Sequence, residues 1–308
     1  MIVTVASGKG GTGKTTVAVN LAVTAIESEG KVELFDCDVE EPNAHLFINP
    51  QNVVTQEIST IIPAVDMNLC NLCGECEKIC QFSAITMIAK KIMVFPEMCH
   101  SCKGCIMVCP TGAVKEGARV LGSLHTGRSS RGFNLTWGEL RVGEAMSPPL
   151  INKVKSKISK ETSILSIVDA PPGTSCPAVA TLRDSDFALL VAEETPFGLN
   201  DLSLTVEGLK KLGVPMGIVI NRADTEPSEK GGAVVYKKGI IDEYAAKEKI
   251  EIIERIPFSR AAAKVCAKGL FLVEELPEMK AIFNKIYSKI TSIVNNKRQN
   301  SEQREGIR

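Results

Sequence analysis

Residues 8–16 read Gly8-Lys9-Gly10-Gly11-Thr12-Gly13-Lys14-Thr15-Thr16. The glycines let the backbone turn sharply without Cβ clashes, so that successive N–H groups can surround a bound anion. An apolar run over residues 3–6 precedes this stretch, and Val17, Leu21 and Ala25 follow it at helical spacing. This order of strand, glycine loop and helix, with Gly-Lys-Thr closing the loop, indicates a phosphate-binding loop rather than a glycine-rich surface turn.

The residues of this loop suit the phosphates of a nucleotide that is bound with magnesium. Lys14 places a positive charge beside the outer phosphates, Thr15 offers a hydroxyl to Mg²⁺, and the following helix adds the positive end of its dipole. The loop backbone supplies the cradle. We therefore predict nucleotide contacts from Gly8, Lys9, Gly10, Gly11, Thr12, Gly13, Lys14, Thr15 and Thr16.

The position of Lys9, early in the loop, narrows the prediction. The nine residues resemble the deviant Walker A motif of the MinD/ParA superfamily, which also includes the nitrogenase iron protein and the Mrp-type cluster carriers. The resemblance implies an ATPase that binds ATP with Mg²⁺ and closes into a homodimer, in which Lys9 reaches the nucleotide of the partner subunit. The alternative for Lys9 is a solvated loop lysine.

Aspartates at the ends of two apolar runs extend the resemblance. Asp36 and Asp38 end the run over residues 31–37, and Asp169 ends the run over residues 163–169. In the superfamily such residues orient the attacking water and hold the magnesium shell, which implies water positioning by Asp38 and magnesium contacts from Thr15, Asp36 and Asp169. Phosphoryl transfer needs this kind of help more than covalent catalysis. The alternative is aspartates that cap strand-to-loop junctions.

Three more positions carry over from the resemblance. Gly173 follows Asp169 in the sequence Asp-Ala-Pro-Pro-Gly, which implies that its N–H senses the γ-phosphate. Asn221 and Arg222 fall where the superfamily reads adenine, and residues 256–258 resemble the loop that closes over the base. The catalytic set implied by the resemblance is Lys9, Lys14 and Asp38.

The apolar runs also predict the fold class. Residues 187–192 and 216–221 add two further buried-strand candidates to the runs over residues 31–37 and 163–169. Strands of this kind that alternate with helices predict an α/β fold with a doubly wound, mostly parallel sheet. The superfamily resemblance covers residues 1–62 and 118–295, and the segment between them interrupts it. We expect residues 117–148 to form a return strand and a mobile loop.

The interrupting segment holds eight of the 11 cysteines, in two groups of four. Each group reads Cys-x-x-Cys-x-x-Cys-x-x-x-Cys, and each member of the second lies 29 positions after its counterpart in the first, which indicates an internal duplication. With this spacing, three cysteines wrap one 4Fe–4S cluster and the fourth points to the cluster of the other half. The predicted sets are Cys70, Cys73, Cys76 and Cys109 for one cluster, and Cys99, Cys102, Cys105 and Cys80 for the other.

This block resembles a bacterial two-cluster ferredoxin, with Cys109-Pro110 matching its ending and Gln81 departing from the usual proline after Cys80. The resemblance implies a small α+β ferredoxin domain, residues 63–117, inserted into the ATPase domain. A pair of zinc sites is the alternative, although zinc sites do not need a doubled three-plus-one pattern. Cys176 offers a further alternative, a cluster shared between subunits, against a buried thiol.

Two functions from different classes fit this combination. In the first, ATP-driven dimer closure is coupled to electron transfer through the two clusters to a redox partner protein. In the second, the chain is an ATPase that carries or assembles an iron–sulfur or metal cofactor for an acceptor protein. Stable ligation of the clusters, and Ala178-Val179 where a second cysteine would follow Cys176-Pro177, favour the first. A spatial-positioning ATPase is a weaker third alternative.

Composition excludes several other classes. Lys and Arg total 36, as do Asp and Glu, and a zero net charge argues against nucleic acid as a partner. The sequence has no signal peptide and no apolar run long enough to span a membrane, so we expect a cytoplasmic protein. Apolar residues at helical spacing over 282–293 predict a core-facing last helix, rather than a membrane-docking one. Residues 296–308 are predicted to be a disordered tail.

Overall fold

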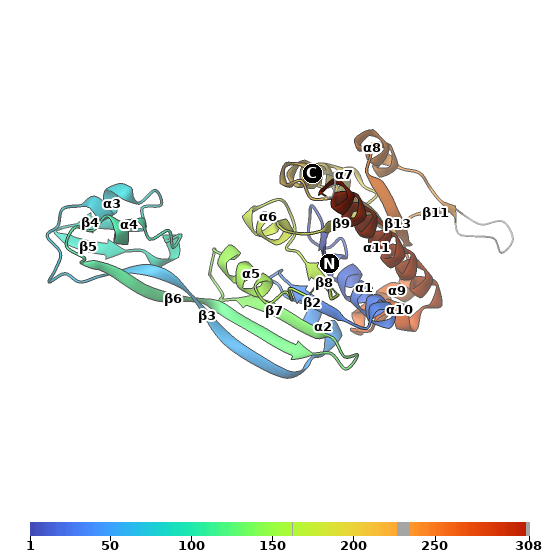
Figure 1. Cartoon of the computed structure of the whole chain (residues 1–308), viewed down its shortest axis with the longest axis horizontal. Coiled ribbons are helices and arrows are strands. Elements are labelled where there is room, and N and C mark those ends of the chain that lie inside the picture. Colours follow the sequence, from blue (N-terminus) through green and yellow to red (C-terminus); the bar gives the residue numbers. More distant parts are fainter. Residues whose placement is uncertain (162, 227–234, 306–308) are drawn as a thin grey trace.

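A computed structural model describes residues 1–161, 163–226 and 235–305. Its centre is a nine-stranded sheet in which seven neighbouring strands run parallel and the last two are added by antiparallel pairing (Figure 1). The predicted α/β class with a mostly parallel sheet is therefore confirmed. In spatial order the strands are β13 (Glu251–Pro257), β10 (Met216–Ala223), β9 (Phe187–Glu193), β1 (Ile2–Ala6), β8 (Leu165–Asp169), β2 (Val32–Asp36), β7 (Asn134–Leu140), β6 (Val114–Arg128) and β3 (Gln51–Val65).

Helices cover both faces of the parallel part of the sheet. One face packs against α1 (Lys14–Glu29), α2 (Ala44–Ile48), α9 (Arg260–Ala267), α10 (Leu272–Glu275) and α11 (Pro277–Glu305). The other packs against α5 (Pro148–Lys155), α6 (Cys176–Leu182), α7 (Pro196–Leu212) and α8 (Ile240–Glu248). A short hairpin of β11 (Thr225–Glu226) and β12 (Val235–Tyr236) lies apart from the sheet.

The alternation of side chains along the strands explains this layering. In β1, Val3 and Val5 join the core beneath α1 and α11, whereas Ala6 joins the core on the opposite face. Successive residues of a strand point to opposite faces, so a strand buried on both sides must be apolar throughout. The helix-spaced residues Val17, Leu21 and Ala25 of α1 are all buried against this sheet, as their spacing predicts.

The two antiparallel strands extend well beyond the rest of the sheet. β3 and β6 have 15 residues each and pair along their length, from Gln51 opposite Arg128 to Val65 opposite Val114. At ~3.3 Å per residue each strand spans about 50 Å. Only residues 122–128 of β6 pair with β7, so the far part of β3 and β6 forms a free two-stranded ribbon, which leads to the cysteine-rich segment (Figure 1).

A small lobe, residues 66–113, sits at the far end of this ribbon (Figure 1). It contains the hairpin of β4 (Ile85–Ile88) and β5 (Lys91–Val94), together with three short helices. These helices are α3 (Glu75–Ile79), η1 (Pro96–Met98) and α4 (Gly104–Met107). Its small core joins Cys76, Ile85 and Cys105 with Val114, the first residue of β6. We call residues 66–113 the cysteine lobe.

Two parts of the chain differ from what the sequence predicts. Residues 117–148 form the predicted return strand, as most of β6. Where the sequence predicts a mobile loop they form a tight turn, in which the N–H of Ser129 donates to the backbone oxygen of Phe133, and a second strand, β7, before the irregular residues 141–147. The pairing of these strands with distant partners orders them. α11 continues to Glu305 where the sequence predicts a disordered tail from residue 296, because Lys, Arg, Gln and Glu extend a helix that is already nucleated. Residues 306–308 lie outside the described residues.

The apolar face of α11 lies against the sheet, as the core-facing alternative predicts. Phe283, Ile286 and Ile290 are all buried among residues of α1 and the central strands. Among the described residues, no helix has both the length and the apolar content that crossing a membrane requires.

Candidate nucleotide and cluster sites

The glycine loop joins the end of β1 to the start of α1. Gly13 is the N-cap residue of α1 and has a φ of +92°, a left-handed conformation that favours glycine. Gly8 lies so close to α7 that an added Cβ would come within 2.3 Å of the backbone oxygen of Asp201. The loop therefore packs against α7. Gly8 is required because of this close approach, and Gly13 because of its positive φ.

Lys14, Thr15 and Asp169 meet at this loop. Lys14 is 6% exposed, and the hydroxyl of Thr15 donates a hydrogen bond to Oδ2 of Asp169 at the end of β8. The other carboxylate oxygen of Asp169, Oδ1, is buried and has no hydrogen-bond partner in the described structure. An unpaired buried carboxylate oxygen is costly, and one beside a threonine hydroxyl suits a hydrated Mg²⁺.

Asp36 is buried one strand away. Its Oδ1 accepts the N–H of Asp38 at 3.0 Å, and its Oδ2 accepts the N–H groups of Asn43 and Ala44, each at 3.0 Å. Burial raises the pKa of Asp36 to about 6, although these hydrogen bonds act to lower it. Asp36 thus holds the loop that leads into α2, and its predicted magnesium role stays a prediction.

Asp38 lies two residues further on, partly exposed at the same edge of the sheet. Burial raises its pKa to about 6, while the positive charge of Lys14 opposes the rise. Gly173, with a φ of +89°, donates its N–H to the backbone oxygen of Ser7 at 3.0 Å. The structure therefore brings the predicted water-positioning, metal and γ-phosphate residues to one end of the parallel strands.

A cavity of about 160 Å³ opens beside Gly13 and Thr16. Asn221 and Arg222 line it together with residues 256–259, which places the predicted base-reading residues and the predicted closing loop around one space. The amide of Asn221 already donates to the backbone oxygen of Thr12 at 2.7 Å, and its Oδ1 accepts the N–H of Arg222. Its reading of adenine therefore stays a prediction.

Lys9 does not stand free in solvent. Its Nζ lies 3.5 Å from Oε2 of Glu193, and the other oxygen of that carboxylate accepts from the guanidinium of Arg222. The sequence reading missed Glu193. Its signal is its position, an acid at the carboxyl end of a buried parallel strand, where α/β sheets bind their ligands. Cys266 of α9 lines the same cavity as Asn221 and Arg222, and its position in the sequence carries no such signal.

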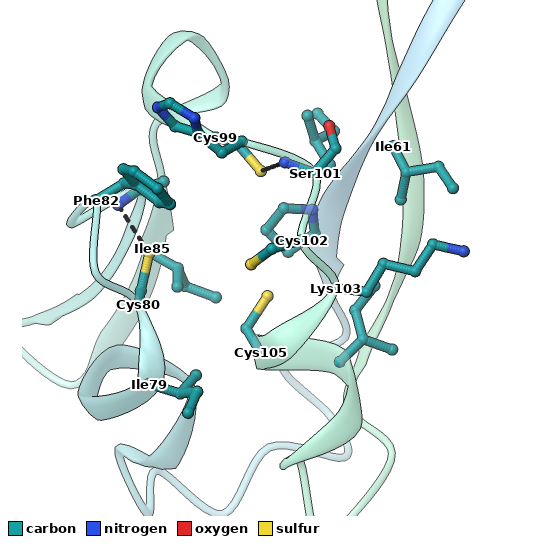
Figure 2. A pocket seen from close by; sticks show the side chains of 15 residues that line it. Ile61, Ile79, Cys80, Phe82, Ile85, Cys99, Ser101, Cys102, Lys103 and Cys105 are labelled. Atoms are coloured by element: carbon teal, nitrogen blue, oxygen red, sulfur yellow. Dashed lines mark hydrogen bonds between the residues drawn. The ribbon is translucent and has the colours of Figure 1, made fainter. Parts of the chain in front are cut away.

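The second cysteine group gathers around a pocket in the cysteine lobe. Cys99, Cys102 and Cys105 line this pocket, and Cys80 of the first group joins them (Figure 2). In Figure 2 the sulfur atoms of Cys102 and Cys105 point toward one another, while Cys80 comes from the opposite wall. The N–H of Ala84 donates to Sγ of Cys80 at 3.3 Å, and that of Ser101 to Sγ of Cys99 at 3.5 Å.

Three of the other four cysteines, Cys70, Cys76 and Cys109, also approach one another. Burial raises the pKa of Cys76, and the charges of Cys70 and Cys109 act on it in the same direction. Burial also raises the pKa of Cys109, but N–H groups of Val114, Thr111 and Ala113 and the Thr111 hydroxyl outweigh it, so the net pKa is lowered. A lowered thiol pKa favours the thiolate, the form that binds metal.

The backbone of the cysteine lobe repeats with the same offset as its sequence. Left-handed φ values occur at pairs of residues 29 positions apart, namely Leu72 and Ser101, Gly74 and Lys103, and Ser83 and Gly112. The hydrogen bond from Asp66 N–H to Ala113 has its counterpart in that from Phe95 N–H to Ala84, each at 2.8 Å. The duplication therefore extends from sequence to backbone, and the two halves exchange contacts.

Two further observations bear on metal. In residues 1–161, 163–226 and 235–305, no group of three or more His, Cys, Asp or Glu side chains is arranged to hold a single metal ion. Cys176, for which a buried thiol was the simpler prediction, is exposed at the start of α6 because α6 begins at the surface beside an open groove. Cys37 is buried, as expected of a small residue in an apolar strand.

Fold and loop together define an α/β nucleotide-binding protein of the P-loop class. Residues 3–273 match the model of the CobQ/CobB/MinD/ParA nucleotide-binding domain, and the chain belongs to this family. An uncharacterised protein of Methanocaldococcus jannaschii is 30% identical, covering 96% of this chain and 98% of its own length.

Two more proteins show what the chain is similar to. An iron–sulfur cluster carrier protein of Aquifex aeolicus is 26% identical, and the alignment covers 96% of this chain and 68% of the carrier. The septum site-determining protein MinD of Pyrococcus horikoshii, solved with Mg-ADP, superposes with a TM-score of 0.56 at 20% identity, covering 94% of this chain and 95% of MinD. The likeness to MinD shows the fold.

Proposed function

We propose that this chain is a magnesium-dependent ATPase of iron–sulfur cluster metabolism. It holds two 4Fe–4S clusters in the cysteine lobe, an inserted ferredoxin-like domain, and carries or assembles an iron–sulfur or metal cofactor for an acceptor protein. The observation that carries the proposal is that one polypeptide places Cys80 with Cys99, Cys102 and Cys105 around one pocket, and an unpaired Asp169 oxygen beside the phosphate loop.

The residues of the nucleotide site fit ATP with Mg²⁺. Thr15 and Asp169 would hold the hydrated ion, which supplies charge neutralisation to the phosphates when it is bound. Lys14 adds a fixed positive charge, the loop N–H groups orient the phosphates, and ionised Asp38 positions the attacking water. Gly173 would exchange its hydrogen bond to Ser7 for one to the γ-phosphate. This exchange would link the position of residues 169–173 to hydrolysis.

A homodimer closed by ATP completes the proposed mechanism. Lys9 leaves Glu193 and reaches the phosphates bound by the partner subunit, where it stabilises charge that develops during hydrolysis. Because the pair with Glu193 is partly exposed, its loss costs little and a phosphate of higher charge can replace it. Asn221 and Arg222 line the cavity that would receive the base.

The donor set of the cysteine lobe fits two clusters. Thiolates are the usual ligands of iron–sulfur clusters, and hydrogen bonds from backbone N–H groups to the sulfurs tune them. Such bonds reach Cys80 and Cys99. In this arrangement Cys70, Cys73, Cys76 and Cys109 would hold one cluster, and Cys80, Cys99, Cys102 and Cys105 the other.

The cofactor-carrying role is supported by the relative from Aquifex aeolicus, which is named an iron–sulfur cluster carrier protein. Nucleotide-coupled electron transfer is the second candidate. It is favoured by the position of the cysteine lobe at the far end of the free two-stranded ribbon, where a redox partner can reach it (Figure 1). Both roles use the same ATPase and the same resident clusters.

One experiment separates these roles. Protein purified without oxygen, reduced and freed of excess reductant, is given ATP, ADP or no nucleotide in two parallel reactions. One contains an apo-ferredoxin, whose bound iron is followed, and the other contains an oxidised viologen dye as electron acceptor, whose reduction reports oxidation of the resident clusters. The carrier role predicts ATP-dependent gain of iron by the acceptor. Cluster oxidation that depends on ATP without iron transfer would favour electron transfer instead. Iron-free protein, or protein that does not hydrolyse ATP, would refute the proposal.

A further inference from the structure

We propose that the nucleotide site acts on one of the two clusters, the one held by Cys80, Cys99, Cys102 and Cys105, through a continuous series of contacts that ends at Ser101. The inference rests on the proposed function and adds the route of its regulation. The route runs from the loop after Asp38 to residues 140–147, then to Arg119 and Thr60 of the ribbon, and then to Ser101 of the cysteine lobe. Arg119 and Thr60 are positioning residues in this route.

The first step joins the loop after Asp38 to residues 140–147. The N–H of Leu140 donates to the backbone oxygen of Val39 at 2.8 Å, and the hydroxyl of Ser147 donates to Oε1 of Glu40 at 3.3 Å. Val39 and Glu40 directly follow the residue that would position the attacking water. A shift of Asp38 on nucleotide binding therefore pulls on both ends of residues 140–147.

The second step fixes residues 140–147 to strand β6 of the ribbon. The N–H of Arg141 donates to the backbone oxygen of Leu121 at 2.8 Å, and Glu144 forms an ion pair with the guanidinium of Arg119. The Glu144 side chain is 0% exposed and that of Arg119 is 6% exposed. A buried pair of this kind is lost only at high cost if one partner is removed, so the two segments move together.

The buried pair is incompletely satisfied. In the part of the chain that the structure describes, Nε and Nη2 of Arg119 are buried without a hydrogen-bond partner. Unpaired donors in a low-dielectric interior are costly, and they favour a second arrangement in which they find acceptors. A small shift of residues 140–147 therefore changes which donors of Arg119 are hydrogen-bonded. The pair can in this way adopt two discrete arrangements, as coupling between distant sites requires.

The third step crosses the ribbon and enters the cysteine lobe. Arg119 stands opposite Thr60 of β3 in the strand pairing. The hydroxyl of Thr60 lies 2.6 Å from the hydroxyl of Ser101, at hydrogen-bond distance. Ser101 in turn donates its N–H to Sγ of Cys99 at 3.5 Å. Hydrogen bonds to cysteine sulfur are among the groups that set a cluster's reduction potential, so the route ends on a group that can tune it.

The route singles out one cluster. Ser101 lies between Cys99 and Cys102, both in the set that lines the pocket with Cys80. Leu72, the counterpart of Ser101 in the first half, has no hydroxyl side chain and cannot make the corresponding bond. The hydroxyl contact of Ser101 to the ribbon thus has no equivalent at Leu72, which predicts that only the cluster of Cys80, Cys99, Cys102 and Cys105 senses the nucleotide.

The test compares the intact protein with Thr60→Val, which removes the hydroxyl and keeps the shape of the side chain. Thr55→Val is the matched control, because it makes the same change on the same strand and removes a bond to His125 outside the route. Electron paramagnetic resonance of the reduced clusters, redox titration and ATP hydrolysis are measured with ADP, with a non-hydrolysable ATP analogue and without nucleotide.

We expect the analogue to shift the signal and potential of one cluster only, the cluster that Cys80→Ser removes. Thr60→Val should abolish this shift while ATP hydrolysis stays within about twofold, and Thr55→Val should keep the shift. Glu144→Gln provides a second test of the route, since it should also abolish the shift. Full retention of the shift in Thr60→Val, or an equal response of both clusters, would overturn the inference.

Failure of the route and failure of the proposed function give different results. If the protein hydrolyses ATP and holds both clusters, but their spectra are the same in all nucleotide states, the route is wrong and the proposed function stands. If iron or ATP hydrolysis is missing from the parent protein, both are wrong. Hydrogen exchange of residues 114–121 with and without nucleotide gives a readout independent of the clusters, and the route requires a change there.

Discussion

Asp36 and Asp169 occupy facing positions on the neighbouring parallel strands β2 and β8, and both are completely buried. Burial raises the pKa of each carboxyl, the charge of the nearby Asp38 raises both further, and the charge of Asp36 also raises the pKa of Asp169. Such a pair destabilises the nucleotide-free protein when both groups are ionised. It is the arrangement expected where a magnesium ion normally neutralises the charge.

Asp169→Asn should therefore stabilise the nucleotide-free protein and remove magnesium-dependent ATP hydrolysis. A carboxyl whose pKa is raised on folding contributes stability at low pH and loses it as the pH rises through the folded-state pKa. The gain in melting temperature of the variant should thus be small near pH 4, close to the ordinary pKa of an aspartate, and grow as the pH rises toward the raised pKa of Asp169. Thermal unfolding measured across this range checks it, and an equal gain at every pH would contradict it.

The pKa of Asp38, about 6, predicts how the reaction depends on pH. If ionised Asp38 positions the attacking water, lowering the pH should reduce kcat/KM to half near pH 6. Below that, kcat/KM should fall about tenfold for each pH unit. Asp38→Asn should be slow at all pH values and lack this step. A parent profile that stays flat from pH 7 to pH 5 would remove Asp38 from catalysis.

Lys14→Ala should abolish ATP hydrolysis and leave the absorbance of the clusters intact, because Lys14 belongs to the phosphate loop and the cysteine lobe lies at the far end of the ribbon (Figure 1). Loss of a charge preorganised for transferring phosphates typically costs at least 100-fold in rate. Lys211→Ala, at an exposed position of α7, is the control. Full activity of the Lys14 variant would refute the assignment of the active site.

Single Cys→Ser variants should fall into two spectroscopic classes. Cys80→Ser and Cys99→Ser should remove the same cluster signal, whereas Cys70→Ser and Cys109→Ser should remove the other, because Cys80 lines the pocket of the second group. Each variant should keep about half of the iron of the parent protein, by iron analysis after purification without oxygen. Cys176→Ser, outside the cysteine lobe, should keep all of it. Grouping of Cys80 with Cys70 would contradict the exchange of the fourth ligand.

Glu193→Gln should favour the ATP-bound dimer, since it releases Lys9 and Arg222 from their shared carboxylate. Partly exposed ion pairs contribute roughly 0.2–1 kcal/mol, which corresponds to at most about a fivefold change in the dimerisation constant. Sedimentation with a non-hydrolysable ATP analogue measures it. Lys9→Ala should cancel the effect, and a weaker dimer in Glu193→Gln would show that Glu193 acts within the interface instead.

Sequence reasoning reached the parts of this molecule whose chemistry is local. The glycines of residues 8–13 predict a turn that leads into a helix. The run that ends at Asp169 is apolar and predicts a buried strand, and the spacing of the cysteines predicts the contact between Cys80 and the second group. Each depends on residues close in sequence, or on a repeat that can be counted. The family and the mostly parallel sheet followed from these.

The remainder depends on pairing between distant segments, which periodicity does not reveal. Residues 51–57 are exposed along their whole length, so this part of β3 has no alternation of buried and exposed residues that would identify a strand. The strand forms because it pairs with β6. The contact of Glu193 with Lys9 and the burial of Glu144 against Arg119 likewise bring together residues far apart in the sequence. Only the folded sheet makes these side chains neighbours.

The two ends of the cysteine lobe meet where Val65 stands opposite Val114. The chain therefore enters and leaves the lobe at neighbouring points. The two strands that connect the lobe to the sheet, β3 and β6, are hydrogen-bonded to each other along their length. A lobe attached in this way can be exchanged or deleted by joining the two strands with a short turn, without disturbing the nucleotide-binding domain. The same geometry gives the domain an edge at which a small lobe can be added while the pairing of the central strands stays unchanged.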